Sequence, residues 1–261
     1  LETGYNNSMA YTGAGDSTNR TFAVLGNGND ALKNIGSGAL VWTGAFSNTK
    51  AAASTLTFGG TNALANEFQG ALINSTAGGH ILTVTKADKG TWIFSGANTY
   101  TGTTTIAAGT LQADRADVAA TSGALGNGGN ISFTGGTLQY TANSAGTNYA
   151  ARIVSNTTAA IKLDTNGQNV TFGTALSSTN TAGLTKEGAG QLELKMGAGQ
   201  YTGTTTINGG TLKFAGLADL NGIDSSSINI NNGASLVIYS DFNRTSLSGK
   251  TFTFGSTGGG S

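Results

Sequence analysis

The chain of 261 residues contains no cysteine, no proline and only one histidine. Without cysteine it cannot be a disulfide scaffold, and it can form neither a zinc–thiolate site nor a cysteine nucleophile. The single histidine, His80, follows two glycines. We interpret it as an exposed turn residue rather than a metal ligand or a member of a catalytic triad. We therefore expect no metal ion and no cofactor.

Charge is scarce as well, because charged residues make up 10% of the chain and 13 basic residues balance 13 acidic ones. Phosphate binding needs clustered lysine and arginine, so we expect no nucleic-acid partner. No apolar run approaches the ~18 residues of a membrane helix, and we expect no membrane insertion by this segment. The chain lacks an initial methionine and a visible signal peptide, so we expect it to be part of a longer protein.

Glycine is abundant instead, with 42 of 261 residues, more than twice its usual share of about 7%. Threonine and aromatic residues favour strands, whereas glycine and asparagine favour tight turns and left-handed backbone. Branched apolar residues are spread evenly along the chain, which is not typical of disorder. The composition predicts an all-β chain with many short strands.

One threonine-rich phrase occurs twice, about a hundred residues apart. SGANTYTGTTTIAAGTLQ spans residues 95–112 and MGAGQYTGTTTINGGTLK spans 196–213, and both contain YTGTTTI. The similarity extends to two pairs of longer segments: 82–112 with 184–213 and, more weakly, 17–44 with 147–174. We expect a single β-helical domain over 1–261, with internal units at about 11–113 and 140–214 and a partial third unit from about 239.

The expected strands are short and bounded by glycine, as in GTWIFSG (90–96) and GTTTIAAG (102–109). Apolar residues alternate within them, which places Trp92 and Phe94 on one face. Such strands fit a sandwich, a propeller or a solenoid. A sandwich would show short hairpin turns between matched strands, whereas repeats of drifting length suit a solenoid. We favour a parallel β-helix.

The second copy carries a pattern that resembles a known family. The pattern consists of Lys186, Gly188, Gly190, Leu192, Leu194 and the run from Tyr201 to Leu212. It is similar to the autotransporter-associated β-strand repeat, which occurs in passenger regions of bacterial autotransporters, and the similarity covers most of residues 17–214. The resemblance implies a right-handed parallel β-helix, exported as a stalk or surface fibre, with no catalytic residue in the repeat. The first copy departs at Asp88, where glycine is usual, and we expect an altered turn there.

The repeated phrase contains a T-x-T pattern, formed by Thr103 with Thr105 and by Thr204 with Thr206. Alternation with the inward isoleucines, Ile106 and Ile207, directs these threonines outward and directs Thr104 and Thr205 inward. Outward T-x-T arrays on successive coils are known from ice-binding β-helices. The strands adjacent in sequence read TLQA and WIFS, which argues against such an array, so we interpret the threonines as exposed strand-favouring residues.

Acidic and aromatic residues are the remaining candidates for a functional site. Carbohydrate-active β-helices need paired carboxylates or a calcium–carboxylate cluster, and the candidates are Asp114, Asp117, Asp219 and Asp224. We interpret these as solvated turn residues. A sugar-binding strip would need exposed aromatics, and the candidates are Trp42, Trp92, Tyr100 and Tyr201. We assign the tryptophans to the core and the tyrosines to coil corners.

These observations predict a non-catalytic, structural β-helical segment located outside the cell or on the bacterial cell surface. A glycan- or surface-binding adhesin module is the alternative, and a carbohydrate-active enzyme is a third hypothesis. We assign no catalytic, cofactor-binding or metal-binding residue. The expected partners are further copies, by end-to-end self-association, or neighbouring repeats of a longer chain, with surface glycans as a further candidate.

Overall fold

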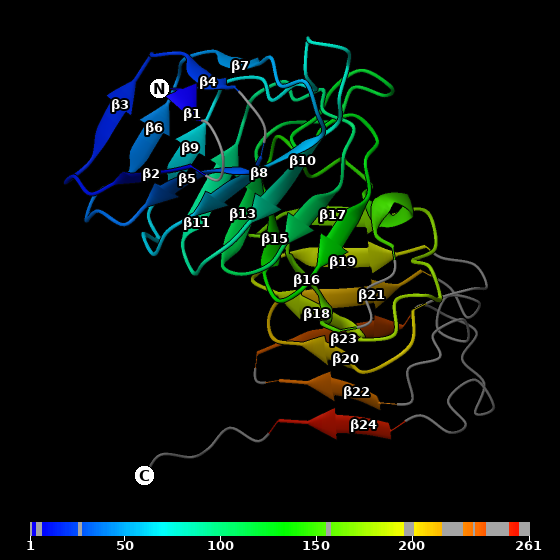
Figure 1. Cartoon of the computed structure of the whole chain (residues 1–261). Helices are drawn as coiled ribbons and strands as arrows, with labels where there is room; N and C mark the ends of the chain where they lie inside the picture. Colours follow the sequence, from blue (N-terminus) through cyan, green and yellow to red (C-terminus); the bar gives the residue numbers. More distant parts are fainter. Residues whose placement is uncertain are drawn as a thin grey trace. The chain divides into compact units, whose positions relative to one another are not determined.

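The computed structural model describes residues 2–3, 7–25, 28–154, 158–195, 201–215, 227–231, 233–238 and 251–255. The chain divides into two compact units, Leu1–Leu138 and Gln139–Ser261. Strand β15 (Thr137–Tyr140) contains the boundary. Apart from the short 3-10 helix η1 (Ala150–Arg152), the regular elements described in both units are β-strands (Figure 1). The prediction of an all-β chain is confirmed.

The first unit winds through three parallel sheets. One contains, in spatial order, β2 (Ser8–Tyr11), β5 (Asp30–Asn34), β8 (Ser54–Gly59), β10 (Leu82–Lys86), β12 (Thr104–Ile106) and β14 (Ile131–Phe133). The second contains β3 (Asp16–Thr18), β6 (Leu40–Trp42), β9 (Asn66–Phe68), β11 (Thr91–Phe94) and β13 (Thr110–Ala113). The third contains β1 (Glu2–Thr3), β4 (Phe22–Val24) and β7 (Phe46–Asn48).

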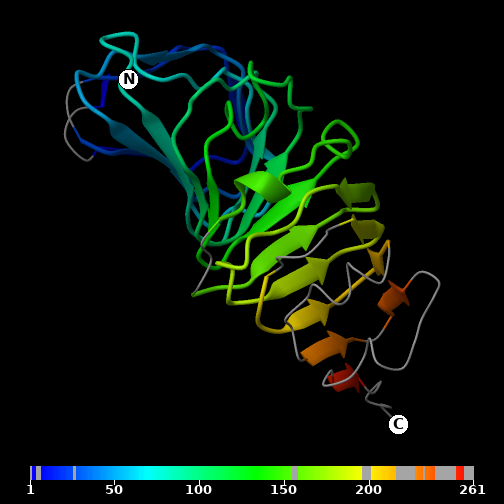
Figure 2. The same ribbon diagram turned by 90° about the vertical axis from the view of Figure 1, so that its right-hand side faces the viewer.

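The second unit is also built from parallel strands, which form two main stacks (Figure 2). One stack is formed by β16 (Ile161–Asp164), β18 (Leu184–Glu187), β20 (Thr205–Ile207), β22 (Ser227–Ile230) and β24 (Thr251–Phe254). The other is formed by β17 (Asn169–Phe172), β19 (Gln191–Leu194), β21 (Thr211–Phe214) and β23 (Ser235–Ile238). Every strand pair in these stacks is parallel. The predicted parallel β-solenoid is therefore the observed fold.

Alternation explains how the core forms. In β11 the side chains of Trp92 and Phe94 are fully buried while their neighbours Thr91 and Ile93 are partly exposed. Because parallel strands stack in register, inward residues of successive coils form columns, such as Trp42, Phe68 and Phe94. Each coil thus covers the apolar face of the next, which is how a repeat protein buries a continuous core.

Stacking also decides which strands are neighbours. Strand β12 pairs with β10 and β14 rather than with β11 and β13, which flank it in sequence. Those two strands belong to a different sheet and pair with each other. The prediction that WIFS and TLQA lie beside the outward threonines is therefore wrong.

Candidate functional site

The most elaborate polar structure in the repeats is a buried lysine at a coil corner. Lys86 ends β10 at an inward position and lies in register between Phe58 and Ile106. The residue is 0% exposed. Its Nζ donates hydrogen bonds to three backbone carbonyls: Ala87 (2.6 Å), Asp88 (3.0 Å) and, on the next coil, Ala108 (3.0 Å). The aliphatic stem thus packs in the core while the ammonium group joins two successive corners.

The second copy repeats this corner. Lys186 is the last inward-facing residue of β18. It is 0% exposed and lies in register beside Ile207. Its Nζ donates to the equivalent carbonyls of Glu187 (2.6 Å), Gly188 (2.7 Å) and Gly209 (3.1 Å). The lysine of the recognised sequence pattern is therefore a structural residue that connects coils.

The departure at Asp88 does not alter this turn. Asp88 has φ 57° and Gly188 has φ 64°, so both occupy the left-handed region that aspartate tolerates better than most residues. In addition, Asp88 Oδ2 accepts a hydrogen bond from the backbone N–H of Gly60 at 2.8 Å. The expectation of an altered turn at this position is wrong, because aspartate adopts the backbone conformation of the glycine it replaces.

Burial also changes the acidity of these lysines. It lowers the pKa of Lys86 from 10.5 to about 8, and the negative charge of Asp88 opposes this shift. It likewise lowers the pKa of Lys186 to about 8, against the opposing effects of Asp164 and Glu187. Both ammonium groups are therefore mostly protonated at neutral pH and can donate all three hydrogen bonds.

A tyrosine–threonine pair forms a second repeated corner. Tyr100 and Thr104 are 0% exposed and their hydroxyl oxygens lie 2.7 Å apart. Tyr201 and Thr205 are buried to the same extent, with hydroxyls 2.8 Å apart. Burial raises the pKa of Tyr201 well above its ordinary value, so the phenol stays protonated. The predictions of corner tyrosines and of inward Thr104 and Thr205 are confirmed.

The aromatic candidates do not form an exposed strip. Trp42 is 3% exposed and Trp92 is 0% exposed. Their indole N–H groups donate to backbone carbonyls, Trp42 to Arg20 at 2.7 Å and Trp92 to Gly59 at 2.8 Å. Both tryptophans are therefore core residues, as predicted, and the two corner tyrosines are buried as well.

The outward threonines form an array that the sequence argument missed. Thr57, Thr85 and Thr105 lie in register on β8, β10 and β12, and Ser132 on β14 continues the row. A second row is formed by Thr55 and Thr83, whose hydroxyl oxygens are 2.7 Å apart. These threonines are half-buried rather than fully exposed. T-x-T patterns therefore do occupy successive coils of the first unit.

The acidic candidates divide between described and undescribed residues. Asp114 and Asp117 are half-buried in the turn that follows β13. Asp219 and Asp224 lie outside the described residues, as does the expected start of a third unit near residue 239. Within the part of the chain that the structure describes, no three histidine, aspartate or glutamate side chains converge as a metal site. His80 directly follows the turn at residues 76–79 and is half-buried, so it is less exposed than predicted.

Sequence reasoning did not identify the charged row on the second unit. Thr171, Glu193 and Lys213 lie in register on β17, β19 and β21. Glu193 is paired with Lys213 at 2.7 Å and with Lys195 at 3.3 Å. The hydrogen bond from Lys213 is the main cause that lowers the pKa of Glu193. The glutamate and the lysine lie on different coils, so the sequence shows them as neighbours only when the register between coils is known.

The fold and its corners define a class: a β-solenoid repeat protein whose repeated residues join coils. Residues 84–113 and 184–214 match the passenger-associated-transport-repeat family. The chain is 30% identical over 193 residues to the "Adhesin BmaC autotransporter" of Brucella suis biovar 1 (strain 1330). The match covers 70% of this chain but 6% of that protein. No solved structure gives a significant match.

These matches confirm the resemblance found in the sequence: the chain is an autotransporter passenger repeat protein. Its location is therefore the bacterial cell surface or the extracellular space. None of the described helical segments is long and apolar enough to cross a membrane.

Proposed function

We propose that this segment is a non-catalytic structural element, a β-helical stalk or adhesin scaffold. The observation that carries this proposal is the recurrence of the same corners, with Lys86 and Lys186 each joining two coils through three carbonyls. The Nζ atoms of these lysines are buried and already donate to backbone carbonyls, so they are unavailable to a ligand. The repeated sequence therefore serves coil stacking.

A segment exchange in the longer surface protein tests this function. Replacing residues 1–261 with an unrelated β-solenoid of similar length should leave surface display and adhesion unchanged. Deleting the segment without replacement should shorten the displayed protein and reduce adhesion by bringing the adhesive part closer to the cell. Loss of adhesion in the replaced protein, at normal display levels, would contradict a purely structural role.

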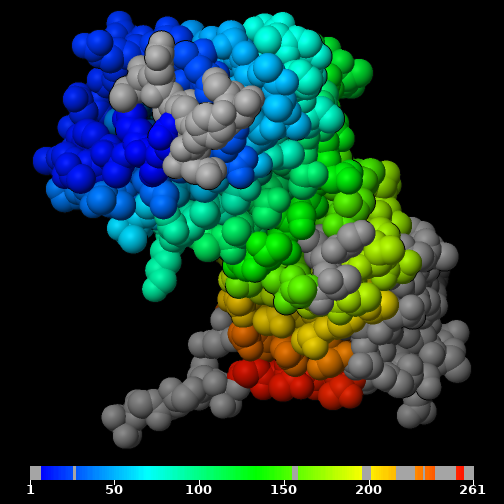
Figure 3. Space-filling model, viewed as in Figure 1, coloured from blue at the N-terminus to red at the C-terminus, as the bar shows by residue number. Residues whose placement is uncertain are grey.

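We further propose end-to-end association through the last described strand, β24, which lies at one end of the second unit (Figure 3, red). Phe254 continues the inward position of Ile230, yet it is 72% exposed. Among the described strands, β24 pairs only with β22. An apolar position and an open strand edge at one place favour docking of a further coil, from the same longer chain or from a second molecule.

Sedimentation velocity over a rising concentration series tests this association. The proposal predicts concentration-dependent oligomers that Phe254→Ser reduces. Val118→Ser is the matched control, because Val118 is 53% exposed in the other unit. A chain that remains monomeric at high concentration would exclude end-to-end association.

The threonine rows favour a second candidate function, surface or glycan binding. They present hydroxyl groups without charge across β8, β10 and β12, including Thr57, Thr85 and Thr105. A glycan array probed with the purified chain would detect such binding. The triple variant Thr57→Glu, Thr85→Glu, Thr105→Glu should abolish it, whereas Thr171→Glu on the second unit should not.

A further inference from the structure

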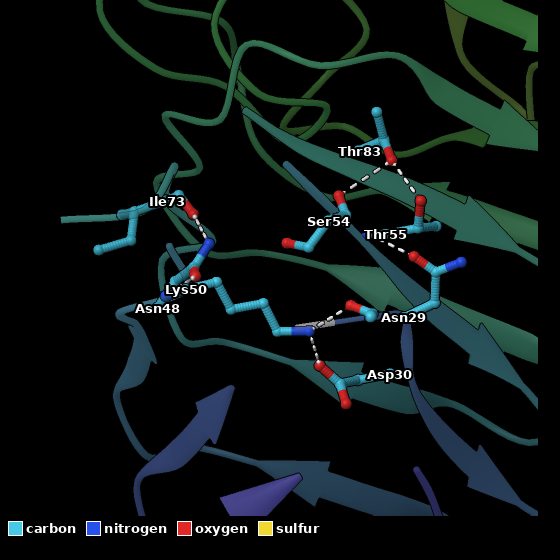
Figure 4. Close-up of polar contacts among 9 residues, drawn as sticks. Asn29, Asp30, Asn48, Lys50, Ser54, Thr55, Ile73 and Thr83 are labelled. Carbon is cyan, nitrogen blue, oxygen red and sulfur yellow. Dashed lines mark hydrogen bonds and ion pairs between the residues drawn. The ribbon is translucent and has the colours of Figure 1, made fainter. Parts of the chain in front are cut away.

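A deeply buried ion pair lies in the coil of the first unit that runs through β5, β6 and β7. Asp30 opens β5, and Lys50 follows β7 two residues after its end. Lys50 Nζ lies 2.5 Å from Asp30 Oδ2, and both side chains are 1% exposed (Figure 4). Nζ also donates to the carbonyl of Gly28 at 2.5 Å. Asp30 Oδ1 is buried without a hydrogen-bond partner.

This arrangement differs from the other buried lysines. Lys86 and Lys186 direct Nζ at backbone carbonyls, whereas Lys50 directs it at a carboxyl group. From the 2.5 Å contact, the distance between Nζ and the carboxyl carbon of Asp30 is at most about 3.7 Å, close to the ~3–3.5 Å of a reactive approach. Only Lys50 among the three is therefore placed to attack a side-chain carbon.

The surroundings favour covalent bond formation between the two groups. Burying two charges is costly because their hydration is lost, and the pair recovers only part of this cost. Proton transfer from the ammonium to the carboxylate yields a neutral amine and a neutral acid. Attack of the amine nitrogen on the carboxyl carbon then forms a C–N bond. The nitrogen proton and a carboxyl oxygen with its own proton leave as one water molecule, and no oxidant or other reagent is consumed.

We propose that Lys50 and Asp30 form an intramolecular isopeptide bond. The remaining N–H of the product amide keeps its acceptor, because Gly28 already accepts a hydrogen bond from this nitrogen. The bond closes the chain from β5 through β6 and β7 into a covalent ring that contains one coil. A chain with no cysteine thereby acquires the kind of cross-link that a disulfide supplies elsewhere, one that restricts the unfolded state.

Mass spectrometry of the purified folded chain tests the proposal directly. After several days of incubation, the intact mass should be lower than the sequence mass by one water molecule. Proteolysis should release a branched peptide in which fragments containing Asp30 and Lys50 are joined. Peptides containing Lys86 and Lys186 serve as internal controls and should remain linear. An intact mass equal to the sequence mass, or a water loss that maps to a linear peptide, overturns the proposal.

Two variants provide chemical controls. Lys50→Arg retains the positive charge but lacks the amine, so its intact mass should equal its sequence mass. Asp30→Asn should lose ammonia instead of water, because the same attack then expels the amide nitrogen. Thermal unfolding should show a lower midpoint for Lys50→Arg than for the cross-linked chain. The result for the unsubstituted chain decides the proposal even where a variant fails to fold.

Discussion

The corner lysine allows a quantitative test of how the coils are held together. Replacing Lys86 with methionine preserves an unbranched apolar stem in the column between Phe58 and Ile106 but removes every hydrogen-bond donor. Three buried carbonyls then lose their bonds to a cationic donor. Leaving these buried acceptors unpaired lowers stability, whereas no longer burying a charge partly offsets that loss. We expect a net decrease of about 3 kcal/mol in local stability.

Hydrogen exchange is the appropriate measurement, because coils of a repeat protein open locally as well as globally. The expected loss corresponds to about 100-fold faster exchange at amides that cross the joined corners, such as Ala107 and Thr110, which donate to Lys86 and Gly90. Lys89→Met, at an exposed lysine in the same turn, is the control and should leave exchange unchanged. Equal exchange in the two variants would refute a coil-joining role for Lys86.

The other predictions concern protonation, the buried hydroxyl pair and glycine packing. The pKa of Lys186 is about 8 in the folded chain, against an ordinary value of 10.5, so between these two pH values the unfolded state binds more protons than the folded state. The free energy of unfolding, measured by urea titration, should therefore rise from pH 8 towards pH 10, and it should rise less in Lys186→Met. Tyr201→Phe should cost about 1 kcal/mol, and a double-mutant cycle with Thr205→Val should give a favourable coupling energy between the two hydroxyls. Gly109→Ala should destabilise the folded chain by more than about 3 kcal/mol, because its added Cβ would lie 2.3 Å from a carbonyl oxygen. Gly128 also has a positive φ, but no atom lies within 4 Å of an added Cβ. Gly128→Ala should therefore cost only about 1–2 kcal/mol of backbone strain.

Local features of the fold could be predicted from the sequence because short-range rules determine them. Alternation identified the inward positions of Trp92 and Phe94, and both are fully buried. The same rule separated inward Thr104 from its outward neighbours. The corner role of Tyr100 followed from its place before a glycine and a strand. Each of these inferences uses residues within a few positions of one another.

Contacts between coils could not be predicted, because coil length varies in the first unit. Register partners are 28 residues apart from Leu56 to Val84, 20 from Val84 to Thr104 and 27 from Thr104 to Ile131. Self-comparison of the sequence aligns the two similar units, but it does not reveal which strands stack inside one unit. The threonine rows and the pair of Asp30 with Lys50 depend on that stacking.

The repeated motif and the outward columns carry different information. Motif positions such as Lys186 and Tyr201 are buried and bind other parts of the same chain, so their recurrence identifies a way of stacking coils. Outward positions are not constrained in this way: in one column of the second unit Thr206 is followed by Asn229, whereas the first unit presents rows of threonine. We therefore expect a binding specificity that distinguishes one such segment from another in the outward positions, which the family motif leaves free to vary.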